Sequence, residues 1–260
     1  MATALIKGGR PFWGGIMGGW AAASRLFPAM WLFGPACKGI LGLFKREVNR
    51  PLLALAAGFL VCLAVVQGGT TITVGTNTVV GHFQNMMDHN STEQLSSRRI
   101  GLALAIPYRG ELLPTNIEPE RKKLIESQKP IRFGLAFGIM ALLGWGLRKA
   151  DDDEAFAYGF IPFFLLTTAS YYYYVARVTL IIAHASDLSK RRNQVGAIIL
   201  LAAECFCNWA EIRHPAHRVY LIGHLAWMLA FYTVVMTGFW LWESRRTTTK
   251  AQATGLLSTD

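Results

Sequence analysis

Apolar residues gather in long windows without charge, separated by short charged segments. The cleanest window, 219–242, stops just before the charged sequence ESRR, while 155–176 follows an acidic run and 52–66 follows a basic segment. A membrane-spanning helix needs roughly 20 mostly apolar residues, because a rise of 1.5 Å per residue must cover about 30 Å of hydrocarbon. We therefore expect each of these windows to be a transmembrane helix.

Two shorter windows extend this pattern. Residues 133–147 lie between Arg132 and Arg148, two side chains long enough to reach the membrane surface from the ends of a short span. Residues 195–210 are apolar except for Glu204. The five windows together predict a bundle of about five transmembrane helices.

The N-terminal segment 11–44 is apolar but interrupted by Pro28, Pro35, Arg25 and Lys38. Such interruptions favour an interfacial helix or a kinked segment over a straight span. The expected fold is thus an all-α integral membrane protein. Its expected parts are a basic, apolar N-terminal interfacial segment (1–50), a transmembrane helix (51–67), an extramembrane loop region (68–129), a four-helix transmembrane region (130–243) and a polar tail (244–260).

Composition agrees with this class. Hydrophobic residues make up 52% of the 260 residues and charged residues only 16%, against about 25% in soluble domains. The net charge is +10, and most basic residues flank the apolar windows or precede Pro51. This distribution predicts contact with anionic lipid headgroups rather than with nucleic acid, since no nucleic-acid recognition motif accompanies the charge.

Polar residues at membrane depth are the main candidate site. Taken as one helix, residues 155–186 would be about 48 Å long, and Tyr171, Tyr172, Tyr173 and Tyr174 would point all round it. Buried tyrosine hydroxyls require hydrogen-bond partners. We therefore expect aromatic packing of this run inside the bundle or along a protein partner.

Counting residues from the predicted turns places three ionisable groups at one level. Arg177 precedes Lys190 by 13 residues and Glu204 follows it by 14, while Glu204 and His224 each lie 10 residues from His214. An isolated charge inside a bilayer is costly, so such groups pair or face a cavity. We predict an Arg177–Glu204 ion pair completed by His224 or a tyrosine hydroxyl, acting as a structural lock or as part of an ion path.

Metal and cofactor sites are not expected, apart from bound lipid. His214 and His217 lie close together in a predicted loop, but a metal needs three or four converging ligands. Cys205 and Cys207 are two residues apart, which puts them on different sides of a helix.

The charge pattern leaves the orientation open. The run 190–192 is basic and 151–154 is acidic, which suggests opposite sides of the membrane. Short-loop counts instead favour an N-terminus on the cytoplasmic side. A sixth span within 11–44 would place both termini there.

Three functions fit the sequence. The first is a non-catalytic multi-pass subunit of a larger membrane assembly of the energy-converting, secretion or conjugation type, with other membrane subunits as partners. The second is a homo-oligomeric channel or small transporter with Glu204 lining its path. The third is a membrane-embedded enzyme using His214, His217 and His224, although no catalytic motif is present.

Overall fold

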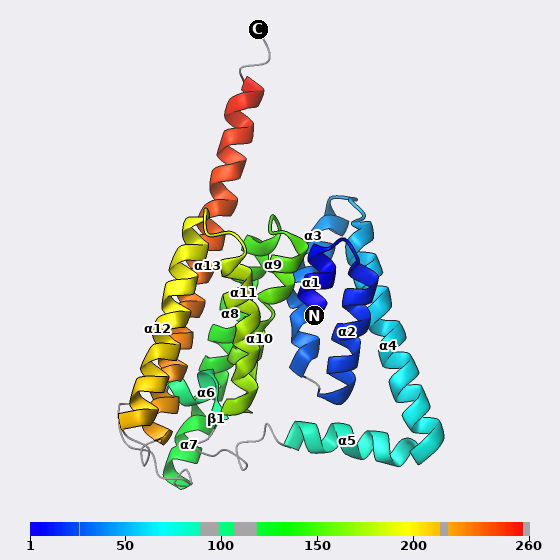
Figure 1. Cartoon of the computed structure of the whole chain (residues 1–260), viewed down its shortest axis with the longest axis vertical. Coiled ribbons are helices and arrows are strands. Elements are labelled where there is room, and N and C mark those ends of the chain that lie inside the picture. Colours follow the sequence, from blue (N-terminus) through cyan, green and yellow to red (C-terminus); the bar gives the residue numbers. More distant parts are fainter. Residues whose placement is uncertain (26, 89–98, 107–118, 214–217, 257–260) are drawn as a thin grey trace.

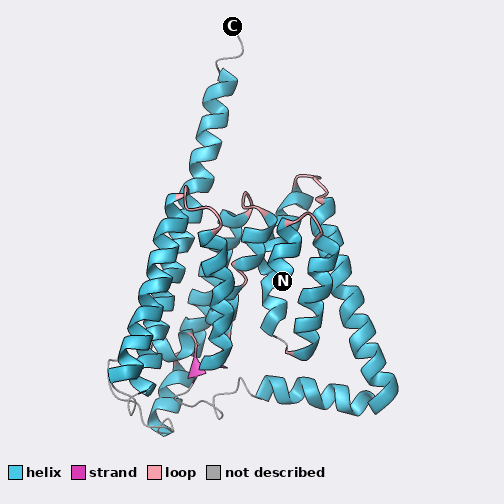
Figure 2. Ribbon diagram, in the orientation of Figure 1, coloured by secondary structure: helices cyan, strands magenta, loops and turns pink. Residues whose placement is uncertain are grey.

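The structure, a computed structural model, describes residues 1–25, 27–88, 99–106, 119–213 and 218–256. Nearly all of the described chain is helical, and the expected all-α class is confirmed (Figure 2). A two-stranded antiparallel ladder of two residues per strand is the sheet structure found in these ranges.

The N-terminal half is a set of helices that run along one common direction, followed by one that lies across it (Figure 1). Its elements are α1 (Ala2–Lys7), α2 (Pro11–Ser24), the 3₁₀ helix η1 (Phe27–Leu32), α3 (Phe33–Phe44), α4 (Arg50–Val74) and the crosswise α5 (Thr76–Asp88). Residues 11–44 therefore form a bent hairpin, and α4 continues seven residues past the expected end at 67.

Glycines allow α2 and α4 to pack with their backbones in contact. A Cβ atom added at Gly15 would lie 2.1 Å from the Leu55 carbonyl oxygen, and one added at Gly58 would lie 2.1 Å from the Phe12 carbonyl oxygen. Gly15 and Gly19 have the spacing of small residues that permits such close approach. The pairing of Gly15 with Leu55 and of Gly19 with Phe59 shows that the two helices run in parallel.

The C-terminal half contains the bundle proper. Its elements are β1 (Arg99–Ile100), α6 (Leu102–Ala105), α7 (Pro119–Ser127), α8 (Lys129–Leu147), α9 (Asp152–Ala157), α10 (Phe160–Leu166), β2 (Ala169–Ser170), η3 (Tyr171–Arg177), α11 (Val178–Ala185), α12 (Arg191–Arg213) and α13 (Arg218–Leu256). The last helix continues through most of the segment expected to be a polar tail and projects beyond the bundle (Figure 1).

The prediction of one helix over 155–186 is wrong. Thr167 is extended (φ −116°, ψ 159°), and its hydroxyl donates to the Phe163 carbonyl at 2.7 Å, which helps to end α10. The chain then pairs with β1, Ile100 opposite Ala169 and Arg99 opposite Ser170. These residues belong to a segment about 70 positions earlier, so a local pattern did not reveal the break.

This break changes the direction of the chain. Residues 152–166 run away from one end of the bundle, and residues 171–185 return to it (Figure 1). The acidic run 151–154 and the basic run 190–192 therefore lie at the same end, not at opposite ends as the charge pattern suggested. The hairpin shape is the physical reason, because a chain that turns back ends where it began.

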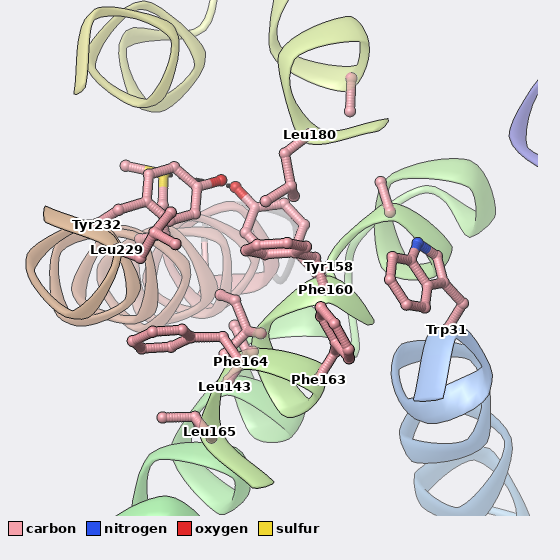
Figure 3. Packing of buried hydrophobic residues seen from close by; sticks show 14 of the residues in the cluster. Trp31, Leu143, Tyr158, Phe160, Phe163, Phe164, Leu165, Leu180, Leu229 and Tyr232 are labelled. Carbon is pink, nitrogen blue, oxygen red and sulfur yellow. Dashed lines mark hydrogen bonds between the residues drawn. The ribbon is translucent and has the colours of Figure 1, made fainter. Parts of the chain in front are cut away.

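The two halves join through an aromatic core and two close backbone contacts. The Trp31 ring from η1 lies 5.9 Å from that of Phe163, and Trp31 points toward α10 in Figure 3. A Cβ at Gly34 would lie 2.1 Å from the Ala155 carbonyl oxygen, and one at Gly159 would lie 2.2 Å from the Trp31 Cα. The start of α3 thus packs directly on α9.

Four helical stretches in the described residues are long and apolar enough to cross a membrane: Phe27–Phe44, Arg50–Val74, Lys129–Leu147 and Gly223–Arg245. Arg50–Val74 and Lys129–Leu147 contain the expected windows 52–66 and 133–147, and Gly223–Arg245 overlaps the window 219–242. The first of the four, Phe27–Phe44, lies within the segment 1–50 that is expected to be interfacial. Window 155–176 is broken, and 195–210 is one continuous helix within α12 that falls outside these four.

We expect Gly34→Ala to destabilise the protein by about 1–3 kcal/mol, because the added methyl group overlaps backbone atoms of α9. Gly39→Ala is the matched control on the same helix. Nothing lies within 4 Å of its added Cβ, so it should be neutral or stabilising by up to about 1 kcal/mol. Unfolding of both purified variants measures the difference, and equal stability of the two would contradict the close contact.

Candidate functional site

Arg177 and Glu204 form an ion pair near the middle of the bundle. The Arg177 Nε–H donates to Glu204 Oε1, and Nη1 donates to the Tyr174 carbonyl at 2.8 Å. Arg177 ends η3, and Glu204 lies 13 residues after the start of α12 and nine before its end. The structure thus brings together the two charges that residue counting put at one level.

His224 lies at this level on α13, but it contacts α12 through another residue. Its ring centroid is 5.5 Å from that of Phe206. Phe206 follows Glu204 by two residues and leaves the helix about 200° round from it. The structure therefore places His224 beside the ion-paired layer, against an aromatic side chain.

Tyr174 is the member of the tyrosine run whose side chain the structure describes. It is fully buried, and its hydroxyl donates to the Ile100 carbonyl at 2.8 Å. Its ring packs on Phe163 at 5.0 Å and on Phe160 at 5.8 Å. The side chains of Tyr171, Tyr172 and Tyr173 lie outside the described residues. Because η3 is a 3₁₀ helix, the run does not have the α-helical spread that the sequence suggested.

A second polar cluster, not predicted from the sequence, surrounds the acidic start of α9. Each of its four carboxylates faces a base from another part of the chain. The contacts are Asp151 with Lys190 at 3.8 Å, Asp152 with Lys38, Asp153 with Lys7 at 3.9 Å, and Glu154 with Arg192 at 2.6 Å. We call these eight residues the α9 acid cluster. It links α1, α3 and α9 to the first turn of α12.

Arg192 is the most buried cation of this cluster, with 4% of its surface exposed. Its guanidinium donates to both Glu154 and Glu243, and its Cζ lies 3.9 Å from the centroid of the Trp240 ring. A buried charge held by two carboxylates and an aromatic face is fixed in position. Arg192 therefore ties α9, α12 and α13 together.

Lys190 closes the cluster at its more exposed edge. Its Nζ lies 3.3 Å from Glu154 Oε1 and 3.3 Å from Asp187 Oδ2. Burial opposes the charge, but the Glu154 and Asp187 carboxylates together outweigh burial, and the pKa of Lys190 is raised. The lysine is accordingly held charged at neutral pH.

A buried hydrogen-bond chain lies beside Arg192. Asn193 Nδ2 donates to the Asp187 carbonyl at 2.9 Å, so its Oδ1 is left as an acceptor facing His184 Nδ1 at 3.1 Å. His184 Nδ1 therefore carries the proton, and the Tyr232 hydroxyl donates to Nε2 at 2.7 Å. Gly196 makes room for the ring, because a Cβ there would lie 2.3 Å from Nε2.

The sequence signal for the α9 acid cluster is the acidic run 151–154 itself, and two of its four bases lie in the basic run 190–192. A single span over 155–186 would put the two runs at opposite ends, so the sequence alone does not predict their contact. His184 gave no signal of its own, since a histidine near a helix end has many roles.

Within the described residues, no group of three or more histidine, cysteine or acidic side chains is placed to hold a metal ion. His214 and His217, named for the enzyme alternative, lie outside the described residues. Comparison of the chain with protein-family models, curated proteins and solved structures finds no match.

We expect Glu154→Gln to destabilise the protein by about 3–5 kcal/mol, because it leaves the buried Arg192 with one carboxylate fewer. Asp151→Asn is the matched control in the same run. Its side chain is 74% exposed, so the change should cost less than about 1 kcal/mol. Thermal unfolding in one detergent compares the two, and similar losses would show that Glu154 has no special role.

We expect Tyr232→Phe to cost about 1–3 kcal/mol, since it removes the hydroxyl that donates to the buried His184 Nε2. Thermal unfolding of the purified variant measures this loss. A Tyr232→Phe protein as stable as the parent would contradict the hydrogen-bond chain.

Proposed function

We propose that this chain is an integral membrane protein and a non-catalytic subunit of a larger membrane assembly of the energy-converting, secretion or conjugation type. Four helical stretches of spanning length and composition support membrane insertion. Large apolar side chains are exposed along these helices, such as Leu60 (63%) and Phe137 (58%). Soluble proteins rarely leave such continuous apolar surfaces uncovered. Lipids and other membrane subunits are the partners that this surface suits.

The observation that carries the subunit proposal is the position of the Arg177–Glu204 pair. The Arg177 and Glu204 side chains are 15% and 30% exposed, and Glu204 lies midway along α12. The surface beside them is apolar, with Val178, Ile198 and Leu201 between 45% and 65% exposed. A charge pair left open to hydrocarbon is costly. A helix of another subunit that covers this face and offers a polar group removes that cost.

A second candidate function is a channel or small transporter with Glu204 on its path. The broken segments α9–α10 and η3–α11 favour it, because discontinuous helices build the sites of many transporters. The acidic side chain at mid-length would then face a path between copies of the chain. Transport measured in proteoliposomes separates this candidate from the first.

We expect the protein, extracted from its own membrane in mild detergent, to run as a heteromeric complex in native mass measurements. Glu204→Gln should weaken that complex roughly tenfold while leaving the isolated chain folded, because the amide oxygen still accepts a hydrogen bond from Arg177. Cys205→Ser, the exposed neighbour on α12, is the control and should leave the complex intact.

A monomer in the native measurement would contradict the subunit proposal. A pure homo-oligomer that loses transport with Glu204→Gln, but keeps its mass, would establish the channel instead.

A further inference from the structure

Four exposed cations lie together at the end of the N-terminal half. Arg10 precedes α2, and Lys45, Arg46 and Arg50 lie in or beside the connection from α3 to α4. Because α2 and α4 run in parallel with Gly15 opposite Leu55, Arg10 lies beside the first turn of α4. We call these four residues the basic corner.

The basic corner is short of compensating charge. Glu47 is the acidic residue within the connection, and no ion pair joins the four cations to a described carboxylate at 4 Å or less. This differs from the α9 acid cluster at the same end of the molecule, where bases and acids face one another. The corner therefore presents unneutralised positive charge.

Large apolar side chains stand between these cations. Phe44 is 84% exposed, Val48 63% and Trp13 57%. Alternating bases and exposed apolar residues at the end of a helix bundle suit the boundary between headgroups and acyl chains, where cations meet phosphates and apolar side chains leave water. A dissolved anion such as free phosphate has no apolar part that could contact the exposed apolar residues.

The backbone at Arg46 adds a separate indication. The Glu47 N–H donates to the Gly42 carbonyl and the Arg46 N–H to the Leu43 carbonyl, both at 2.9 Å, which is the usual end of a helix capped by a left-handed residue. Arg46 holds that position with φ 59°. Glycine is the common residue there because it adopts this conformation without strain. An arginine in this left-handed conformation, where glycine is common, indicates a functional role for its side chain.

From these features we infer that the basic corner binds the phosphate headgroup of an anionic lipid, with Phe44 and Val48 entering the acyl boundary. The inference rests on the proposed membrane insertion and adds a specific lipid site to it. Each cation near an anionic surface contributes about 1 kcal/mol, which corresponds to about a fivefold change in affinity.

The test uses the full-length protein in detergent, titrated with phosphatidylglycerol or phosphatidylcholine and measured by native mass spectrometry. The parent should bind phosphatidylglycerol more tightly than phosphatidylcholine. Arg46→Gly should lower the phosphatidylglycerol affinity about fivefold and at the same time raise the thermal unfolding midpoint, because glycine relieves the left-handed strain. Lys123→Ala, an exposed base on α7 at the other end, should change neither quantity.

Equal affinity for the two lipids, or an unchanged preference in Arg46→Gly, would overturn the inference. So would a lower unfolding midpoint in Arg46→Gly, since the lipid loss would then follow from a damaged fold. Displacement of the lipid by excess inorganic phosphate, but not by chloride of equal ionic strength, would assign the corner to free phosphate. Extraction of the chain from membranes by alkaline carbonate would instead refute the membrane insertion itself.

Discussion

The buried pair of Glu154 and Arg192 is the contact on which the rest of the architecture depends. Glu154 lies in the first turn of α9, at the start of the broken segment α9–α10. Arg192 lies in the first turn of α12 and also reaches Glu243 on α13. The three acidic neighbours of Glu154 hold Lys7, Lys38 and Lys190. One short acidic run thereby fixes the N-terminal half, the returning hairpin and the last two helices at one end. Removing one partner of such a buried pair is costly, because it leaves the other charge unmatched.

The α9 acid cluster accounts for the arrangement of the interior. With both ends of the hairpin held together, residues 158–166 can fill the centre with aromatic rings that meet Trp31 on one side and Tyr174 on the other. The His184–Tyr232 hydrogen bond lies inside the same region and joins α11 to α13. The Arg177–Glu204 pair lies at the edge of this network. It is joined to the network through the Tyr174 carbonyl, but it is more exposed and opens onto an apolar face.

The sequence predicts the features that depend on local pattern. Charge-free windows locate α4, α8 and α13, and equal spacing from a turn brings Arg177 beside Glu204. Prediction from the sequence fails where contacts between distant segments determine the local structure. The break after Leu166 depends on pairing with residues 99–100, and the close packing of Gly34 on α9 depends on a backbone that is far away in sequence. The α9 acid cluster was missed for the same reason, because its bases come from three separate segments.

The proposed membrane insertion places the Arg177–Glu204 pair at hydrocarbon depth, closed off from water. Cys205 tests it directly, because this exposed thiol adjoins Glu204 on α12. The measurement is labelling by a charged, water-soluble maleimide in membranes opened on both sides, using a variant that keeps Cys205 as its single cysteine. Insertion at this depth predicts no labelling in intact bilayers and full labelling after denaturation in detergent. Rapid labelling in the intact bilayer would show that water reaches this level and would contradict the claim.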